Sequence, residues 1–213
     1  MGYSRHCPDA TEPWSVARRD SHGTMEGMSG LTQRAGRLVV LVGMVGAGKT
    51  TRARQITAER GAVRLTPDEW MIPLFGQDFT DDKYTHRHDI LEGRLISVAL
   101  DVLRAGVDVV LDFGCWAKAE RSALRHLAGS VGAECELVYV PLTEDEQRHR
   151  VRTRWEETPH ATFPITDDDL DGWNDLFQIP EAEELGGGLL DSPPDGFTDW
   201  GHWATERWPS LAV

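Results

Sequence analysis

The sequence contains little cysteine and no long hydrophobic run. Its three cysteines are widely separated and form no C-x-x-C pair, so neither a disulfide framework nor a cysteine-bound structural metal is indicated. No apolar stretch approaches the ~20 residues that cross a bilayer, and the first residues lack the apolar core of a signal peptide. We therefore expect a cytoplasmic protein without a membrane segment.

Basic residues are scarce in the last part of the chain. From residue 155 onward there are 14 acidic residues and one base, Arg207, which leaves 21 of the 22 Lys and Arg residues and 21 of the 35 acids in residues 1–154. A nucleic-acid partner requires a concentrated basic surface, and only the run 148–154 offers one, so such a partner is disfavoured. The acidic part is expected to be a solvated surface or to attract a cationic substrate.

A chain of 213 residues is long enough for one α/β domain and too short for two of ordinary size. Residues 1–36 are rich in Gly, Pro, Ser and Arg without a period, which predicts a flexible leader, with Met25 or Met28 as alternative starts. Residues 37–185 are expected to form the domain. Residues 186–213 are turn-rich and carry three tryptophans, which predicts a tail that packs on the domain.

Residues 43–50, GMVGAGKT, form a complete G-x-x-x-x-G-K-[ST] phosphate loop directly after the apolar run 38–42, an expected buried strand. In such a loop backbone N–H groups surround the β-phosphate, Lys49 reaches the β- and γ-phosphates, and the Thr50 hydroxyl holds Mg²⁺. Helix formers follow at 51–60, so a helix dipole points at the bound anion. The expected nucleotide-binding residues are Gly43, Val45, Gly46, Ala47, Gly48, Lys49, Thr50 and Thr51.

Apolar and helix-forming segments alternate along the rest of the domain. This alternation predicts an α/β, three-layer P-loop NTPase fold with a mainly parallel sheet and helices on both faces. Ligands then collect at the carboxyl ends of the strands. Further strands are expected at 62–65, 107–111 and 135–140. Helices are expected before Gly106, from the stripe Leu91, Leu95, Val98, Val102 and Leu103, and at 118–131, 143–157 and 167–176.

Asp112 follows the apolar run 107–111, as the acid of a Walker B element follows its strand. At that place a carboxylate either binds Mg²⁺ or contacts the acceptor of a phosphoryl group, and the sequence does not separate these two roles. A structural alternative is that Asp112 caps the next helix, because aspartate is favoured at helix N-termini.

Asp68 follows the second expected strand. There its carboxylate would face the γ-phosphate and accept a proton from an acceptor hydroxyl, which makes it the candidate catalytic base. The segment 66–69, TPDE, is also a good helix start, with Thr66 as cap, Pro67 in the first turn and acids near the dipole. Base and cap are both consistent with the local sequence.

Four arginines alternate along the expected helix 143–157. Arg150 and Arg154 are four residues apart and share one face, and Arg148 and Arg152 share another. We expect Arg150 and Arg154 to clamp the phosphates from a lid, while the other pair meets acids of the same helix in solvent.

Several side chains are candidates for contacting an acceptor. Trp70 and Trp116 follow the two aspartates closely and would form apolar walls of a pocket, although core packing explains them equally well. Arg87 and Arg121 would contact the acceptor directly. His86 and His88 are two residues apart, so on a helix their imidazoles point in different directions, and a shared metal is not expected.

The segments 38–51, 65–68, 107–112 and 150–154 together resemble the small P-loop kinases grouped as AAA-type ATP-binding proteins. This group includes chloramphenicol phosphotransferase, zeta toxins and the kinase domain of bacteriophage polynucleotide kinase. The resemblance covers residues 37–184. It implies that Asp68 is the catalytic base and that Arg150 and Arg154 stabilise the transferring phosphoryl group. Lys49, which reaches the phosphates from the loop, is also expected to act in catalysis. Thr158 stands where polynucleotide kinase carries a further arginine, which disfavours a polynucleotide acceptor.

These features predict an ATP- or GTP-dependent kinase that requires Mg²⁺ and phosphorylates a hydroxyl of a small molecule, foremost an antibiotic or nucleoside-like natural product. No N-K-x-D element is present, so ATP is favoured. One alternative is a polynucleotide 5′-hydroxyl kinase, which needs a basic track leading to Asp68. Another is a nucleotide-gated binding protein without an acceptor, in which Asp68 only caps a helix. The oligomeric state is not predicted.

Overall fold

The computed structural model describes residues 34–76 and 81–212. The expected leader therefore lies almost entirely outside the described residues. None of the helices in the described part combines the length and apolar character that a bilayer crossing requires.

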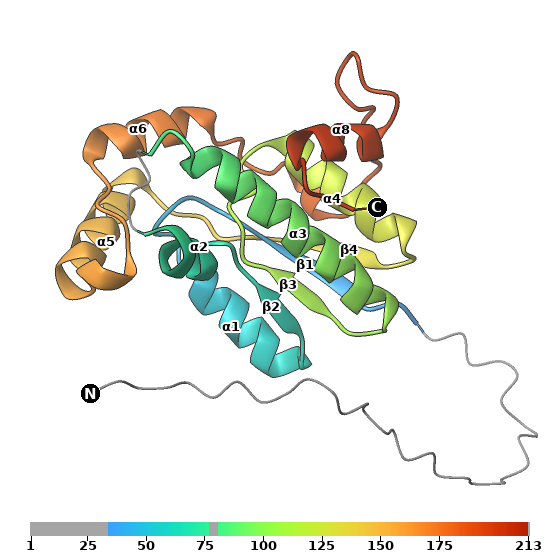
Figure 1. Ribbon diagram of the computed structural model, residues 1–213, viewed down its shortest axis with the longest axis horizontal. Coiled ribbons are helices and arrows are strands. Elements are labelled where there is room, and N and C mark those ends of the chain that lie inside the picture. The colour runs from blue at the N-terminus through green and yellow to red at the C-terminus, as the bar shows by residue number, and fades with distance from the viewer. Residues whose placement is uncertain (1–33, 77–80, 213) are drawn as a thin grey trace, which may run out of the picture. The chain divides into compact units, whose positions relative to one another are not determined.

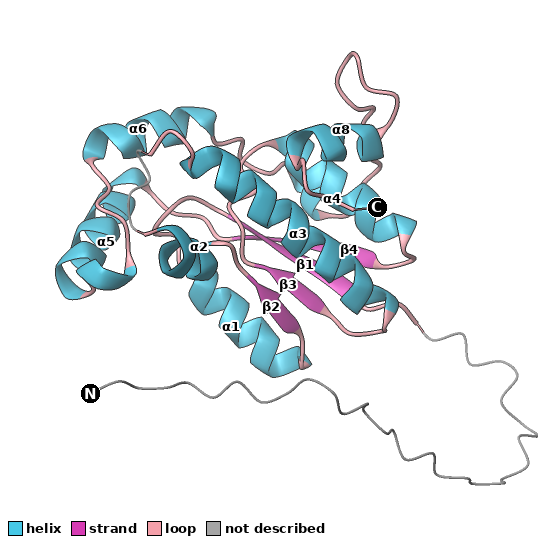
Figure 2. Ribbon diagram, in the orientation of Figure 1, coloured by secondary structure: helices cyan, strands magenta, loops and turns pink. Residues whose placement is uncertain are grey.

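The centre of the structure is a four-stranded sheet in the order β2-β3-β1-β4 (Figures 1 and 2). All of its neighbouring strands are parallel. In the register, Val39 of β1 lies between Val110 of β3 and Glu136 of β4. The sheet confirms the α/β P-loop fold class. The strands are β1 (Arg37–Val42), β2 (Val63–Leu65), β3 (Val109–Leu111) and β4 (Glu134–Tyr139).

Helices cover both faces of this sheet, because alternate residues of a strand point to opposite sides. On one face Val39 and Leu41 pack against Ala53 and Ile56 of α1 (Lys49–Arg60). The other face carries the larger part of the core. There the side chains of Leu38, Val40 and Val42 pack with residues of α3 (Tyr84–Arg104), α4 (Lys118–Ser130) and α8 (Trp200–Arg207).

The remaining helices lie between and after these elements. Helix α6 has the bounds expected from the sequence, and α5 begins one residue later than expected because Thr143 caps it with its side chain. Helix α2 begins at Asp68, within the segment 66–69 that the sequence offered as a helix start, whereas the short helix α7 and the helix α8 were not predicted. The bounds are α2 (Asp68–Phe75), α5 (Glu144–Glu157), η1 (Pro159–Ala161), α6 (Asp167–Leu176) and α7 (Ala182–Leu185).

The buried face of α3 differs from the expected stripe. Val98 is 45% exposed, whereas Ile96 and Leu100 are buried. The C-terminal segment covers α3 on the side of Gly93: a Cβ atom on Gly93 would lie 3.2 Å from the Cβ of Trp208 and 2.9 Å from the backbone nitrogen of Leu211. The buried stripe is therefore rotated away from Val98.

The residues after α6 are part of the same core. Trp200 and Trp208 are buried, and Trp203 packs edge-on against both, with ring centroids 5.8 and 5.9 Å away. The indole Nε1 of Trp200 donates to the carbonyl of Asp191, 2.8 Å away. The tail thus forms a helix and a part of the hydrophobic core.

Ile56→Ala tests the α1 face of the core. Ile56 is fully buried between α1 and the sheet, so truncation loses apolar burial and leaves a cavity, and we expect a loss of about 2–5 kcal/mol in the free energy of unfolding. Denaturant unfolding measures it. The exposed Glu59 of the same helix provides the control, because Glu59→Ala should change stability by about 0.5 kcal/mol or less. Equal effects of the two substitutions would contradict this packing.

Candidate active site

The phosphate loop joins β1 to α1. Its backbone has φ 82° at Gly46 and φ 94° at Gly48, left-handed values that glycine adopts without strain. The ammonium of Lys49 donates to the carbonyl oxygens of Gly43 and Met44, at 2.9 and 3.0 Å. Lys49 is therefore folded back over its own loop, at the N-terminal end of α1 where anions bind.

The charges around Lys49 identify its neighbours. Burial lowers the pKa of the Lys49 ammonium, and the carboxylates of Asp68 and Asp112 oppose that shift while Arg154 adds to it. Charged residues from three separate segments of the chain therefore act electrostatically on one ammonium group. This brings together the base, metal and lid candidates at the phosphate loop.

Asp112 lies at the end of β3, and its side chain is nearly fully buried. Its carboxylate accepts a hydrogen bond from the Thr50 hydroxyl and another from Arg64 Nη1, 2.8 Å away. Burial raises the pKa of Asp112, whereas Thr50, Arg64 and Lys49 favour the charged form. Paired hydroxyl and carboxylate oxygens next to a phosphate loop are the donor set that Mg²⁺ prefers. Asp112 precedes α4 by five residues, so it does not cap that helix.

Asp68 is the first residue of α2 and is exposed. The preceding residue, Pro67, is the N-cap, and no side chain caps this helix. Thr66 is buried without the capping role expected for it. The carboxylate of Asp68 acts on Lys49 and on Tyr84, whose pKa is raised by burial and by this charge. Asp68 therefore lies between the phosphate loop and the start of α3.

Helix α5 lies against the phosphate loop. A Cβ atom on Gly46 would meet Val151 Cγ2 at 3.3 Å and Arg150 Cβ at 3.8 Å. The Arg150 guanidinium donates to the carbonyls of Gly46 and Ala47, at 3.5 and 3.4 Å. This face of α5, with Arg150 and Val151, therefore lies against the backbone of the phosphate loop.

The second pair of arginines on α5 faces α6. Arg148 pairs with Asp171 and, at 3.6 Å, with Asp167, and Arg152 pairs with Asp167 at 3.6 Å. The partners are acids of α6, and not the acids of α5 that the sequence analysis assigned to them. Sequence spacing separates the two faces of a helix but does not show which neighbour packs on each.

The family comparison adds to this geometry. Residues 38–180 match the family model AAA_33, described as an AAA domain. The chain belongs to this family. No curated protein matches the sequence significantly.

Solved structures similar to this AAA domain have the P-loop kinase fold. One, from Chloroflexus aurantiacus and provisionally described as a kinase, is 18% identical, with a TM-score of 0.58, covering 84% of this chain and all of that one. Kti12 from Chaetomium thermophilum, solved with ADP-AlF3, is 17% identical, with a TM-score of 0.56 over 83% of this chain and all of Kti12. A chain of the Pnkp1/Rnl/Hen1 RNA repair complex is 19% identical, with a TM-score of 0.55 over 74% of this chain and 45% of that one.

The expected acceptor residues of the AAA domain lie in different settings. Trp70 is 52% exposed. Because it lies two residues after Asp68 on the same helix, its side chain points away from the side of the helix that carries Asp68. Arg87 pairs with Asp81 at 2.8 Å and lies over the ring of Phe75.

The other two acceptor candidates follow Asp112. Trp116 packs against Trp173 of α6, with ring centroids 5.9 Å apart. Arg121 is fully buried and its Nε lies 2.5 Å from Glu184 Oε1. Because Arg121 pairs with Glu184 inside the core, its guanidinium group does not face an acceptor.

Sequence reasoning missed three residues near the site. Arg64, in the short strand β2, holds Asp112, and the only signal in the sequence was an arginine between apolar residues. Tyr84 packs edge-on against Phe163, with centroids 5.7 Å apart, although 79 positions separate them. Such a contact between distant segments leaves no local pattern in the sequence.

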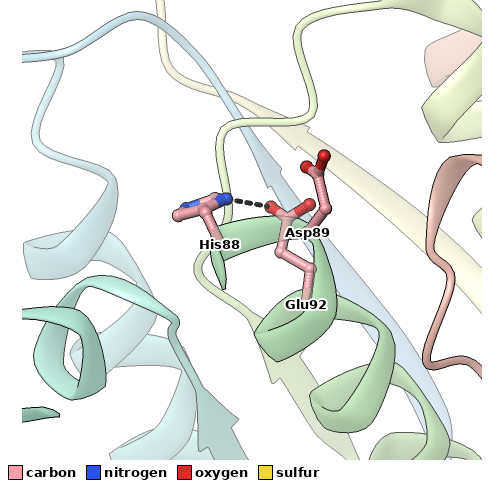
Figure 3. A group of neighbouring side chains, drawn as sticks. All are labelled: His88, Asp89 and Glu92. Carbon is pink, nitrogen blue, oxygen red and sulfur yellow. Dashed lines mark ion pairs between the residues drawn. The ribbon is translucent and has the colours of Figure 1, made fainter. Parts of the chain in front are cut away.

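A cluster of His88, Asp89 and Glu92 lies at the start of α3, with ligand atoms within 4.8 Å of one another (Figure 3). His86 takes no part in it. Arg207 already supplies positive charge to this cluster, 2.5 Å from Asp89 Oδ1 and 3.6 Å from Glu92 Oε2. Trp208 Nε1 also donates to Glu92, 2.9 Å away. We therefore interpret the cluster as the ion-pair anchor of α8.

Glu92→Gln tests this anchor. Burial raises the pKa of Glu92, opposed by His88 and Arg207, so the folded-state pKa lies above the unfolded one. The stability that Glu92 contributes is then present below its unfolded pKa and is lost as pH rises through the folded pKa. Glutamine keeps an oxygen for Trp208 without this titration. The stability of the variant relative to wild type should therefore be higher at pH 8 than at pH 5.

Denaturant unfolding of both proteins at the two pH values gives the comparison. Glu59→Gln, at an exposed site, should show no such change between pH 5 and pH 8. A Glu92→Gln difference that is constant with pH would show that Glu92 is charged in the folded protein throughout this range.

Proposed function

We propose that this chain is a phosphotransferase that moves the γ-phosphoryl group of ATP, or of GTP, to a hydroxyl of a small molecule. The observation that carries the proposal is the arrangement at the phosphate loop, where Lys49 and Arg150 donate to loop carbonyls and the carboxylates of Asp68 and Asp112 act on the Lys49 ammonium. A loop that only binds a nucleotide needs Lys49 but does not need a carboxylate beside it. A carboxylate such as Asp68, exposed beside the loop and engaged in no cap, is the group that a hydroxyl acceptor requires.

Different side chains would have different roles in phosphoryl transfer. Lys49, Arg150 and Arg154 place positive charge around the phosphates, where charge spreads over the transferring group. Asp68 accepts the proton of the attacking hydroxyl. Thr50 and Asp112 fit Mg²⁺, since both offer oxygen atoms and already contact each other. A bound Mg²⁺ would neutralise charge on the β- and γ-phosphates.

Aromatic side chains support a small acceptor. Trp116 and Trp173 pack at the end of the loop that begins with Asp112, and Tyr84 and Phe163 pack near Asp68. Aromatic walls with few polar groups are typical of small-molecule pockets. An antibiotic or a nucleoside-like natural product fits this description.

Charge argues against a polyanionic acceptor. The arginines on the acceptor side pair with carboxylates: Arg64 with Asp112 and Glu69, and Arg87 with Asp81. Guanidinium groups already neutralised in this way do not form the basic track that a polynucleotide needs.

A screen of acceptors tests the proposal. The protein is incubated with Mg²⁺ATP or Mg²⁺GTP and hydroxyl-bearing antibiotics, nucleosides or 5′-hydroxyl oligonucleotides, and mass spectrometry detects the gain of one phosphoryl group. We expect transfer to a small molecule. Transfer to oligonucleotides alone would replace this proposal by a polynucleotide kinase. Nucleotide binding without transfer to any compound would favour a nucleotide-gated binding protein.

Asp68→Asn tests the catalytic base. The amide keeps the size of the side chain but does not take up a proton, so the transfer rate should fall about 10²–10⁴-fold, while nucleotide affinity stays unchanged. Glu69→Gln, in the same helical turn, is the matched control and should retain transfer within a few-fold. Wild-type transfer by Asp68→Asn in a single-turnover assay would remove Asp68 from the mechanism.

Arg154→Ala tests the lid. Because Arg154 acts on Lys49 at the phosphate loop, whereas Arg152 pairs with α6, removal of Arg154 should lower kcat by about 10³-fold, the lower part of the range for arginines that stabilise a transferring phosphoryl. Arg152→Ala should leave kcat within about two-fold. Steady-state kinetics at saturating nucleotide compares them, and equal losses in both variants would contradict a lid with two distinct faces.

A further inference from the structure

The loop from Asp112 to Ala117 connects β3 to α4 and has an unusual backbone. Cys115, at its centre, is buried and has φ 41°, and it is the one non-glycine residue with positive φ among residues 34–76 and 81–212. A left-handed conformation is unfavourable for a side-chain-bearing residue and persists only where the surroundings enforce it. Asp112, the proposed metal ligand, begins this loop, and Trp116 lies near its end.

Arg121 of α4 holds the loop in this conformation. Its Nη1 donates to the carbonyl oxygens of Cys115 and Trp116, at 3.2 and 3.0 Å. Its other two nitrogens pair with both carboxylate oxygens of Glu184, at 2.5 and 3.1 Å. Both side chains are almost completely buried. The planar guanidinium thus fixes two successive carbonyls of the loop while Glu184 fixes the guanidinium.

Glu184 lies in α7, after residue 180 where the match to the AAA domain family ends. The segment just before α7 holds the same loop and the start of α4 through Gln178. The backbone N–H of Gln178 donates to the Trp116 carbonyl at 3.0 Å, and the side chain of Gln178 accepts from the Lys118 N–H at 2.7 Å. The segment 178–184 therefore braces the loop from outside the phosphate-binding core.

We propose that Arg121 and Glu184 are a positioning pair that sets the conformation of the loop 112–117 and thereby the place of Asp112 beside Thr50. The inference rests on the proposed function, because it assigns the metal-binding role to Asp112. It makes Glu184, which lies beyond the family match, a working part of the site. Arg121 then acts through the backbone and does not touch the acceptor.

A buried ion pair is weak evidence for a contribution to stability alone. Replacing both partners by apolar residues of similar volume often leaves a protein equally stable or more stable, because the desolvation cost of the charges disappears. Methionines at both positions would keep the core filled. They would remove the donors to Cys115 and Trp116, so the loop would lose its enforcement.

The test compares the double variant Arg121→Met/Glu184→Met with wild type by calorimetric titration of ATP, with and without Mg²⁺. We expect unchanged affinity for metal-free ATP. The gain in ATP affinity that Mg²⁺ provides should fall about 10–100-fold, the range for loss of groups that orient a metal ligand. Arg60→Met/Glu136→Met removes an ion pair between α1 and β4 and should leave the gain intact.

Arg121→Lys covers the case in which the double variant does not fold. Lysine keeps the charge next to Glu184 but does not reproduce the planar fork, so the same loss of the Mg²⁺-dependent gain is expected with thermal unfolding close to wild type. A wild-type gain in either folded variant overturns the proposal.

Asp112→Asn separates this inference from the proposed function. It should abolish most of the Mg²⁺-dependent gain, and a gain that survives it overturns both the metal role of Asp112 and the positioning pair. A loss in Asp112→Asn with no loss in the two Arg121 variants overturns the positioning pair alone. A silent acceptor screen contradicts the kinase proposal and leaves the titration result standing.

Discussion

The site depends on the hydrogen bonds that the buried carboxylate of Asp112 makes with neighbouring segments. Asp112 accepts hydrogen bonds from Thr50 on the phosphate loop and from Arg64 on β2, and its own N–H donates to the Leu65 carbonyl at 2.9 Å. The start of α1, strand β2 and the end of β3 are thus tied together at one point. Burying a charge is costly unless partners satisfy it, so displacing any one partner leaves Asp112 under-compensated. Coupling of this kind keeps the carboxyl edge of the sheet in one arrangement.

Two layers of contacts surround this point. Lys49, Asp68 and the α5 arginines meet where the nucleotide phosphates are proposed to bind, and they come from segments that the parallel sheet brings to one edge. Behind them, the chain after α6 contributes Glu184, which pairs with Arg121 beside the loop 112–117, and Arg207, which pairs with acids of α3. The acidic C-terminal part therefore includes one buried counter-ion, Glu184 for Arg121, in addition to exposed acids such as those that pair with Arg148 and Arg152.

Patterns with a local physical cause were predictable from sequence. Periodicity, glycine placement and capping predicted the phosphate loop, the alternation of strands and helices along the chain, and the bounds of α6. Thr166, which caps the start of α6 with its side chain, is an example. Contacts between distant segments were not predictable. The partners of Arg148 and Arg121 lie 23 and 63 positions away, and the C-terminal segment packs against α3 at Gly93, more than 110 residues along the chain. Such pairings depend on packing, which no short pattern encodes.

The most direct test of the account is a crystal structure with ADP, Mg²⁺ and a phosphoryl-transfer analogue such as aluminium fluoride. The account predicts the analogue between the Lys49 ammonium and the Asp68 carboxylate, with the oxygens of Thr50 and Asp112 directed at the metal. It predicts open space for an alcohol on the Asp68 side. A structure in which the Asp68 carboxylate points away from the analogue, with packed side chains filling that space, would contradict a hydroxyl kinase.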